Sequence, residues 1–373
     1  MPVIYPGQMI GIIGNDQRAF LLALEAKKMG YKVAMIVNEQ LQASPLATIL
    51  DASVIGDYHQ YADLERLGDI CQVLTYTDEL LDETLLERLA QAYYLPQGSS
   101  VLSVTQDRYL ERVFLDDLNI NIPPSTTVVD EDDIRQGIDS IGYPCILKPI
   151  QKGFGKQYQR FIKAPADLEG IGDFLQLGSY LLESWIPNAQ ELSVMVTKTA
   201  QGQTTVLPVV ENDYHDHQLA LSLVPARIDQ AVAAEIERLA QMISQHLDYV
   251  GVFGIEFFLT PDMNIYVKRI IPTPHISGNV LNRTLNFSQY EYHLKAICQL
   301  AVSDYRLNNA GVTLNIDANL QQLVKTQMKI KPDWYFNLYQ VKPQVTSGFI
   351  TTFGTTVAPL LEKLEAADLY HAK

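Results

Sequence analysis

The sequence is short of basic residues. It has 28 lysines and arginines against 43 aspartates and glutamates in 373 residues, which gives a formal net charge of −15. An excess of negative charge repels phosphate backbones and anionic lipid head groups. We therefore expect neither nucleic acid nor a membrane surface to be a partner of this chain.

Cysteine and long apolar runs are also scarce. Cys71, Cys145 and Cys298 lie far apart in apolar surroundings. This odd, widely spaced set predicts neither a disulfide framework nor a metal site. No stretch reaches the roughly 18 apolar residues of a membrane span, and the first residues do not resemble a targeting signal. We expect a protein of the reducing cytoplasm.

Hydrophobic residues make up 47% of the sequence, enough for a substantial core, and the length predicts two or three lobes. Through the first hundred residues, short β-rich runs alternate with helical ones, which predicts βαβ units and a Rossmann-like parallel sheet. Gly11 and Gly14 lie where the first strand would turn into the first helix. Because this segment is not G-x-G-x-x-G, we interpret it as a tight turn rather than a dinucleotide site.

The rest of the chain divides into further predicted elements. A helix is predicted from about Gln106 to Leu118, and Pro123-Pro124 then marks a boundary. Next come a strand ending at Lys148, a glycine-containing loop over 152–156, a strand, a helix, and strands near 180–185 and 191–197. A long helix over 230–247 leads into an apolar hairpin over 250–270. We predict a Rossmann-like lobe over 1–104, central lobes over 105–300 and a small β-rich lobe over 301–373.

Lys148 is the first residue with a candidate chemical role. It ends an apolar run and precedes the loop with Gly153 and Gly155. A lysine followed by a glycine loop can hold nucleotide phosphates, because the amine supplies charge and the loop supplies amide donors. A lysine extending to solvent from a strand end is an equally good interpretation of this fragment alone.

Three glutamates extend the pattern. Glu183 and Glu191 flank a short Ser-Trp-Ile-Pro segment, an order that suggests an adenine hinge followed by a ribose-binding carboxylate; taken singly, both acids would be ordinary surface groups. Glu256 lies within the apolar strand Phe253-Gly-Ile-Glu-Phe-Phe-Leu. A carboxylate in such a strand must be paired, protonated or metal-bound, and Mg²⁺ is a hard cation that would bind it.

The chain resembles the N-carboxyaminoimidazole ribonucleotide synthetases, a family of ATP-grasp enzymes. The segments 249–258 (YVGVFGIEFF) and 272–278 (PTPHISG) are similar to paired signatures of that family. Shorter matching segments occur in the same order, at 106–108, 182–183, 191–194, 208–212, 224–229 and 288–290. The resemblance covers nearly the whole chain, from about Ile10 to Phe353.

The resemblance implies an α/β ATP-grasp fold and usually a homodimer. It also implies an enzyme of purine biosynthesis that uses MgATP to activate bicarbonate and carboxylate aminoimidazole ribonucleotide. By this resemblance, Glu256 would be one Mg²⁺ ligand, and Gln17, His275 and Ser277 would face the substrate. The residues implied to hold ATP are Arg108, Lys148, Glu183, Ser184, Trp185, Ile186 and Glu191.

Several polar positions depart from the family pattern. The second metal-binding carboxylate, expected thirteen residues after Glu256, is Arg269, and Lys268 precedes it. Arginine presents only donors and cannot coordinate a metal. Phe154 and Gly155 replace a Tyr-Asp pair in the loop, and Thr273 replaces the arginine of a Pro-Arg-Pro-His motif.

Three hypotheses remain open from the sequence. The chain could be a working carboxylating ligase, with Glu211 or Asp213 completing the metal site. It could instead be a noncatalytic nucleotide- or anion-binding paralogue, in which Lys268 and Arg269 supply the charge of the missing metal. The third hypothesis is an ATP-grasp ligase that joins a different acid and amine.

Overall fold

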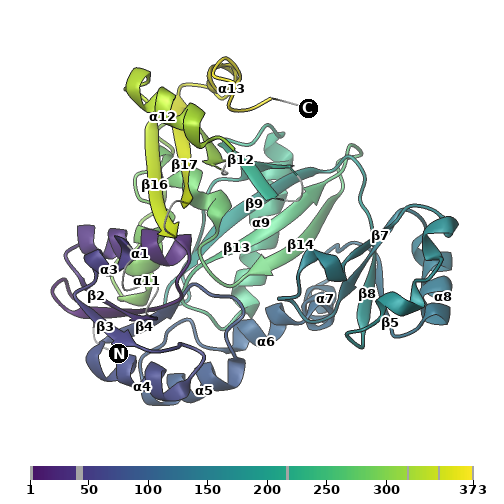
Figure 1. The fold of residues 1–373 in the computed structure, drawn as a ribbon, viewed down its shortest axis with the longest axis horizontal. Coiled ribbons are helices and arrows are strands. Elements are labelled where there is room, and N and C mark those ends of the chain that lie inside the picture. Colours follow the sequence, from purple (N-terminus) through teal and green to yellow (C-terminus); the bar gives the residue numbers. More distant parts are fainter. Residues whose placement is uncertain (1–2, 39–44, 216–217, 317–318, 343–344, 372–373) are drawn as a thin grey trace.

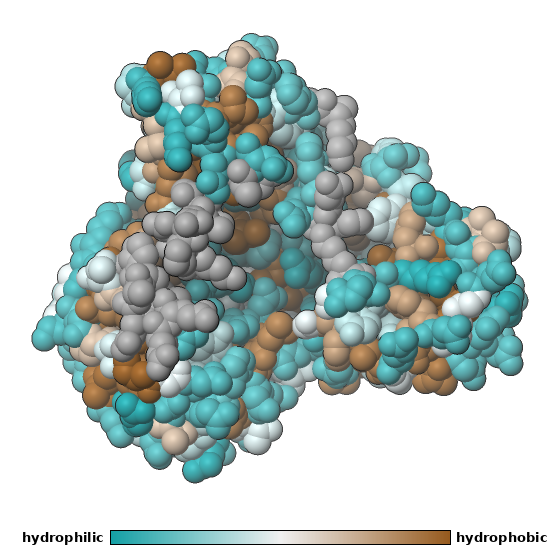
Figure 2. Space-filling view, viewed as in Figure 1, coloured by the Kyte–Doolittle hydropathy of each residue, from teal (hydrophilic) through white to brown (hydrophobic). Residues whose placement is uncertain are grey.

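The computed structural model describes residues 3–38, 45–215, 218–316, 319–342 and 345–371. Three parts are arranged around a central sheet, and Figure 2 shows the surface hollowed between them. The α/β architecture expected from the sequence is confirmed by one parallel and two antiparallel sheets.

The N-terminal lobe is a four-stranded parallel sheet with helices on both faces. Its strands are ordered β3-β2-β1-β4. The lobe's elements are β1 (Met9–Ile13), α1 (Gln17–Lys28), β2 (Lys32–Val37), α3 (Pro45–Ile49), β3 (Ala52–Ile55), α4 (Tyr61–Ile70), β4 (Val73–Tyr76), α5 (Glu83–Ala92) and α6 (Ser100–Gln106). Ile10 and Ile12 pack in the core beside α1, whereas Ile13 packs in the core beside α4 and α5. This alternation along β1 confirms the doubly wound sheet.

The first strand-to-helix turn is structural, as the sequence predicted. A Cβ added at Gly11 would lie 2.5 Å from Leu74 Cδ2, and Gly14 has a φ of +139°. The side chain of Asp16 caps α1 by accepting from the backbone N–H of Ala19. The chain's own carboxylate therefore lies at the helix end where an anion would otherwise bind.

The predicted helix over 106–118 begins later than expected. Asp107 is extended, with φ −105° and ψ 119°, and it separates α6 from α7 (Arg108–Asp117). Its carboxylate accepts from the backbone N–H groups of Tyr109 and Leu110. Asp107 is thus the N-cap of α7, and the chain turns at this point from the N-terminal lobe to the second lobe.

The second lobe is a four-stranded antiparallel sheet with the order β5-β8-β6-β7, and α8 packs on it. Its elements are β5 (Ser125–Val128), α8 (Glu131–Ile141), β6 (Cys145–Pro149), β7 (Arg160–Ile162) and β8 (Tyr180–Ser184). The helix expected between β7 and β8 is replaced by two short 3-10 turns, at Pro165–Leu168 and Gly172–Phe174. At the right of Figure 1 this lobe projects from the rest of the chain.

A nine-stranded sheet forms the centre of the molecule and continues into the C-terminal part. Its main path is β14-β13-β9-β11-β12-β15-β17-β16, with β10 paired to β9. The strands are β9 (Gln190–Lys198), β10 (Thr204–Val206), β11 (Val210–His215), β12 (Gln218–Val224), β13 (Gly251–Leu259), β14 (Ile265–Ile271), β15 (Ala310–Ile316), β16 (Tyr335–Lys342) and β17 (Val345–Gly354). The helices are α9 (Gln230–His246), α10 (Leu281–Thr284), α11 (Gln289–Ile297), α12 (Gln321–Ile330) and α13 (Ala358–Glu365), with a 3-10 turn at Ile276–Val280.

Candidate functional site

A cavity of about 610 Å³ lies between the second lobe and the β13–β14 hairpin of the central sheet. All seven residues that the sequence assigned to ATP line it: Arg108, Lys148, Glu183, Ser184, Trp185, Ile186 and Glu191. The lining has six lysines and arginines against three glutamates, in a chain whose net charge is −15. This local excess of positive charge favours an anionic ligand.

Glu183 is buried in this wall between two cations. Its Oε1 accepts from Lys148 Nζ at 2.6 Å, and its Oε2 accepts from Arg112 Nη2 at 2.7 Å. Burial alone would raise the pKa of Glu183, but Lys148 and Arg112 outweigh it and lower the pKa to about 2. The carboxylate of Glu183 is therefore ionised at neutral pH.

Lys152 and Arg108 extend the cationic wall. Lys152 Nζ donates to Glu111 Oε2 at 2.9 Å, and Glu111 Oε1 accepts from the backbone N–H of Ile270. The guanidinium of Arg108 donates to the carbonyl oxygens of Pro149 and Gln151. These contacts connect α7 and the glycine loop to β14. Groups from both sides of the cavity therefore fix the positions of Lys152 and Glu111.

Glu256 is buried behind the opposite wall, which Lys268 and Arg269 line, and these cations of its own hairpin bind it. Arg269 approaches it in a bidentate geometry, with Nε to Oε2 at 2.7 Å and Nη2 to Oε1 at 3.2 Å. Lys268 Nζ lies 3.3 Å from Oε2, and the hydroxyl of Tyr214 donates to Oε1 at 2.9 Å. Burial would raise the pKa of Glu256, but Arg269 and Lys268 hold it well below its usual range.

These residues do not fit a divalent cation. Both oxygens of Glu256 already accept hydrogen bonds, and its cross-strand neighbour Arg269 has only donors. Glu191, the nearest further carboxylate, accepts from Lys268 Nζ at 2.6 Å. Glu211, a candidate replacement ligand, is ion-paired with Arg227. Within the described residues, no group of three histidine, cysteine or acidic side chains is arranged to hold a metal ion.

A second cavity of about 440 Å³ adjoins the first. Of the three residues that the resemblance places toward the substrate, Gln17 and His275 line it, whereas Ser277 is fully buried and its hydroxyl lies 2.9 Å from His275 Nδ1. Burial lowers the pKa of His275 to about 4, so the imidazole is neutral at pH 7. Arg269 and Tyr214 line both cavities and therefore lie at the boundary between them.

Thr273, which stands where the family motif has an arginine, is contacted by a different arginine. Arg18 Nη1 donates to Thr273 Oγ1 at 3.0 Å. Arg18 also pairs with Asp16 and with Glu79. A guanidinium is therefore present beside this position, although α1 supplies it instead of the segment that follows β14.

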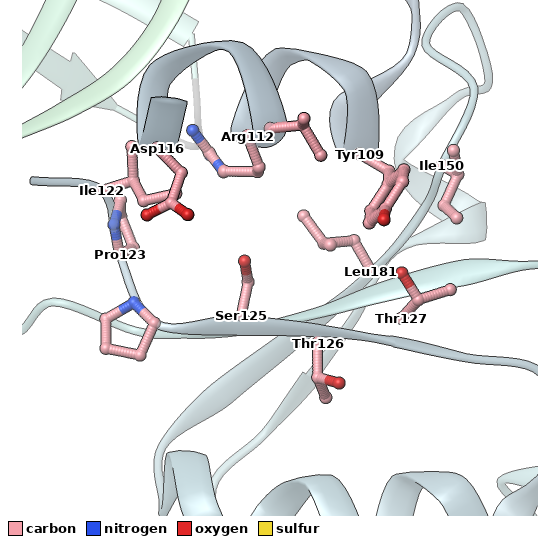
Figure 3. Close-up of a pocket in the computed structure, with 12 residues that line it drawn as sticks. Tyr109, Arg112, Asp116, Ile122, Pro123, Ser125, Thr126, Thr127, Ile150 and Leu181 are labelled. Carbon is pink, nitrogen blue, oxygen red and sulfur yellow. The ribbon is translucent and has the colours of Figure 1, made fainter. Parts of the chain in front are cut away.

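A third cavity, of about 800 Å³, lies on the other side of α7 (Figure 3). Tyr109 and Asp116 of α7 face Ser125 of β5 across it. None of the predicted site residues lines it. Arg112 lines both this cavity and the 610 Å³ cavity, which makes α7 the wall between them.

Among the lining residues of the 610 Å³ cavity that the sequence did not single out are Arg112, Glu111 and Tyr214. Arg112 lies four residues after Arg108 on α7, and a spacing of four places side chains on the same face of a helix. That spacing was an available signal for Arg112. Tyr214 lies on β11, and only the folded sheet brings it to Glu256.

Comparison with known proteins agrees with this geometry. An ATP-grasp domain model matches residues 113–290, and a ribonucleotide synthetase preATP-grasp domain model matches residues 8–106. The N5-carboxyaminoimidazole ribonucleotide synthase of Bacillus subtilis (strain 168) is 31% identical over 352 residues, which cover 94% of this chain and 92% of that protein. The chain belongs to the N5-carboxyaminoimidazole ribonucleotide synthase family.

Solved structures of the family superpose over nearly the full chain. The ADP complex of an N5-carboxyaminoimidazole ribonucleotide synthetase has a TM-score of 0.92 at 30% identity and covers 99% of this chain and 98% of its own. The Staphylococcus aureus enzyme complexed with ADP has a TM-score of 0.91 at 27% identity, with 98% of each chain covered. The resemblance stated from the sequence is thus confirmed. In the described residues, no helix is long and apolar enough to cross a membrane.

Proposed function

We propose that this chain binds ATP in the 610 Å³ cavity and is a ligase that carboxylates aminoimidazole ribonucleotide with bicarbonate in purine biosynthesis. The observation that carries the proposal is the meeting, in one cationic cavity directly beside a second cavity, of the seven residues that the family resemblance assigns to ATP. Relatives that bear the name of this activity cover nearly the whole chain.

The nucleotide would lie with its phosphates toward the lysines. Lys148 and Arg108 supply charge to the phosphates, and residues 183–186 act as the adenine hinge, with Ser184, Trp185 and Ile186 facing the cavity. Glu191 is positioned for the ribose hydroxyls, although Lys268 competes for its carboxylate. Trp185 packs edge-on against Phe161, which gives the base an aromatic neighbour.

The second substrates would occupy the 440 Å³ cavity. Transfer of the terminal phosphoryl group of ATP to bicarbonate gives carboxyphosphate and ADP; attack by the amine of aminoimidazole ribonucleotide then forms the carbon–nitrogen bond and releases phosphate. Gln17 and His275 face this cavity, and Ser277 holds the imidazole of His275. Arg269, which lines both cavities, can stabilise charge on the phosphoryl group during transfer.

A second candidate function is nucleotide or anion binding without turnover. The specific observation in its favour is the bidentate Arg269–Glu256 pair, which occupies the predicted metal ligand. A third is a ligase for another acid and amine, favoured by Arg18 contacting Thr273 on the substrate side. We further propose that the chain is a cytoplasmic homodimer whose lobes are 1–104, 105–300 and 301–373, with β15, β16 and β17 of the last lobe continuing the central sheet. Burial raises the pKa of Cys71 to about 12 and of Cys145 to about 11, which keeps these thiols protonated.

Phosphate release from ATP distinguishes the candidates. We expect hydrolysis that requires bicarbonate and rises with aminoimidazole ribonucleotide if the ligase proposal holds. ADP binding by calorimetry with no stimulated hydrolysis would support the binding paralogue. Hydrolysis that responds to neither compound but to another acid and amine would support the third candidate.

A further inference from the structure

The β13–β14 hairpin contains a bulge beside the 610 Å³ cavity that is proposed to bind ATP, the nucleotide cavity. Glu256 is directly opposite Arg269, whereas the next residue, Phe257, is opposite Val267. Lys268 is therefore the extra residue, and a bulge of this kind re-aims the side chains around it. In a regular strand, Lys268 and Arg269 would point to opposite faces. Here both reach the same carboxylate, Glu256.

The bulge gives the cavity two cations held in place by two acids. Lys268 Nζ lies between Glu191 Oε2, at 2.6 Å, and Glu256 Oε2, at 3.3 Å. Arg269 donates to both oxygens of the Glu256 carboxylate. Both cations line the nucleotide cavity, so the acids are neutralised from the side on which a ligand would enter.

We propose that Lys268 and Arg269 are a built-in counter-ion for nucleotide phosphates, which lets this chain bind ADP or ATP without a divalent cation. The inference rests on the proposed nucleotide cavity and specifies its ionic requirement. Where two carboxylates line a phosphate site, they repel the phosphates until a metal arrives. In this chain each carboxylate carries its own cation.

Arg269 can contact phosphate without leaving the buried carboxylate of Glu256 unpaired. If its guanidinium turns from Glu256 to a phosphate, Lys268 Nζ and the Tyr214 hydroxyl remain within reach of the carboxylate. The planar guanidinium matches two phosphate oxygens in a fork, which an ammonium group does not do. The residue can therefore exchange one oxyanion partner for another within the same cavity.

Calorimetry with ADP tests the inference on the full-length protein. We expect the dissociation constants in EDTA and in excess Mg²⁺ to agree within about threefold, because the counter-charge is already present. Tightening by Mg²⁺ of more than about tenfold would overturn the inference and leave the proposed nucleotide site intact. Absence of ADP binding in both buffers would overturn the inference and the proposed nucleotide site together.

Variants identify the residues responsible. Arg269→Glu should weaken ADP binding in EDTA at least about tenfold, and Mg²⁺ should restore it, because two carboxylates again face the phosphates. Arg269→Gln, which keeps a hydrogen-bonding side chain and adds no acid, serves if the first variant does not fold; it should weaken binding in EDTA. Arg238→Glu on the exposed surface of α9 makes the same charge change outside the cavity and should have no effect. Wild-type affinity in EDTA for both Arg269 variants would refute the inference.

Discussion

Two buried glutamates, Glu183 in one wall of the cavity and Glu256 behind the other, are each held by a lysine and an arginine, yet the two clusters differ in construction. Glu183 receives its cations from different elements, Lys148 from β6 and Arg112 from α7. Glu256 receives both from the adjacent strand of its own hairpin, with Tyr214 as a third donor. The first cluster therefore joins two parts of the fold, and the second is local.

The difference predicts separate consequences for stability and for ligand binding. Removing a cation from the Glu183 cluster breaks a connection between α7 and the second lobe and leaves a buried charge poorly paired. Removing Arg269 leaves Glu256 with two donors. The Glu183 cluster should therefore contribute more to folding, and the Glu256 cluster more to the ionic conditions under which ligand binds.

The largest expected effect is on stability. Arg112→Ala should lower the free energy of unfolding by about 3 to 5 kcal/mol, because Glu183 loses one of two cations in a buried site. Arg269→Ala should cost about 1 to 2 kcal/mol, since Lys268 and Tyr214 still donate to Glu256. Urea denaturation of both variants measures the difference, and equal losses would contradict the distinction between the clusters.

The second-largest expected effect is the loss of stability in acid, which weakens the Glu183 cluster. The folded pKa of about 2 lies below the ordinary glutamate value of 4.5, so the unfolded chain binds the proton first as the pH falls. The stabilisation is complete above pH 4.5 and is lost as the pH falls toward 2, by about 3 kcal/mol in total. Glu256 shifts in the same direction, so both clusters should fail in acid.

Carbon-13 NMR of glutamate carboxyl groups measures these ionisations directly. The Glu183 resonance, assigned by its absence in Glu183→Gln, should stay at its ionised position at pH 4. A Glu183 resonance that titrates near 4.5 would mean that Lys148 and Arg112 do not hold the carboxylate as described.

The third-largest expected effect is on the affinity for ADP. Lys148→Ala should weaken ADP binding by about 1 to 3 kcal/mol, the range of one charge-assisted contact. Lys198 is a matched control, because its Nζ donates to the carbonyl oxygens of Ser244 and Leu247 and it does not line the cavity. Unchanged ADP affinity of Lys148→Ala by calorimetry, together with an intact fold, would remove Lys148 from the proposed site.

The smallest effect provides the baseline for the other three. Arg135 and Glu131 form an exposed pair four residues apart on α8. Arg135→Ala should change the free energy of unfolding by about 0.5 kcal/mol or less, because water screens such a pair and competes for both groups. A loss comparable to that of Arg112→Ala in urea denaturation would show that burial does not separate these ion pairs.

Most of the architecture was predictable because it follows from local patterns. Strands alternate with helices through the N-terminal lobe as predicted, and α9 ends one residue before the predicted helix. The errors occurred where side chains or long-range pairing set the boundary. Asp107 delays α7 by capping it, and the chain between β7 and β8 forms short turns instead of the expected helix.

The sequence by itself determined the family, the fold class and the need to neutralise Glu256. An apolar strand cannot bury a lone carboxylate, so the composition of 253–259 already required a partner. Only the tertiary structure decided which partner. The bulge aims Lys268 and Arg269 at one carboxylate, and β11 brings in Tyr214. The tertiary structure also decided the partners of Lys148 and Glu183, which were predicted as separate ligand contacts. They are hydrogen-bonded to each other, because the register of β6 and β8 brings together residues that are 35 positions apart.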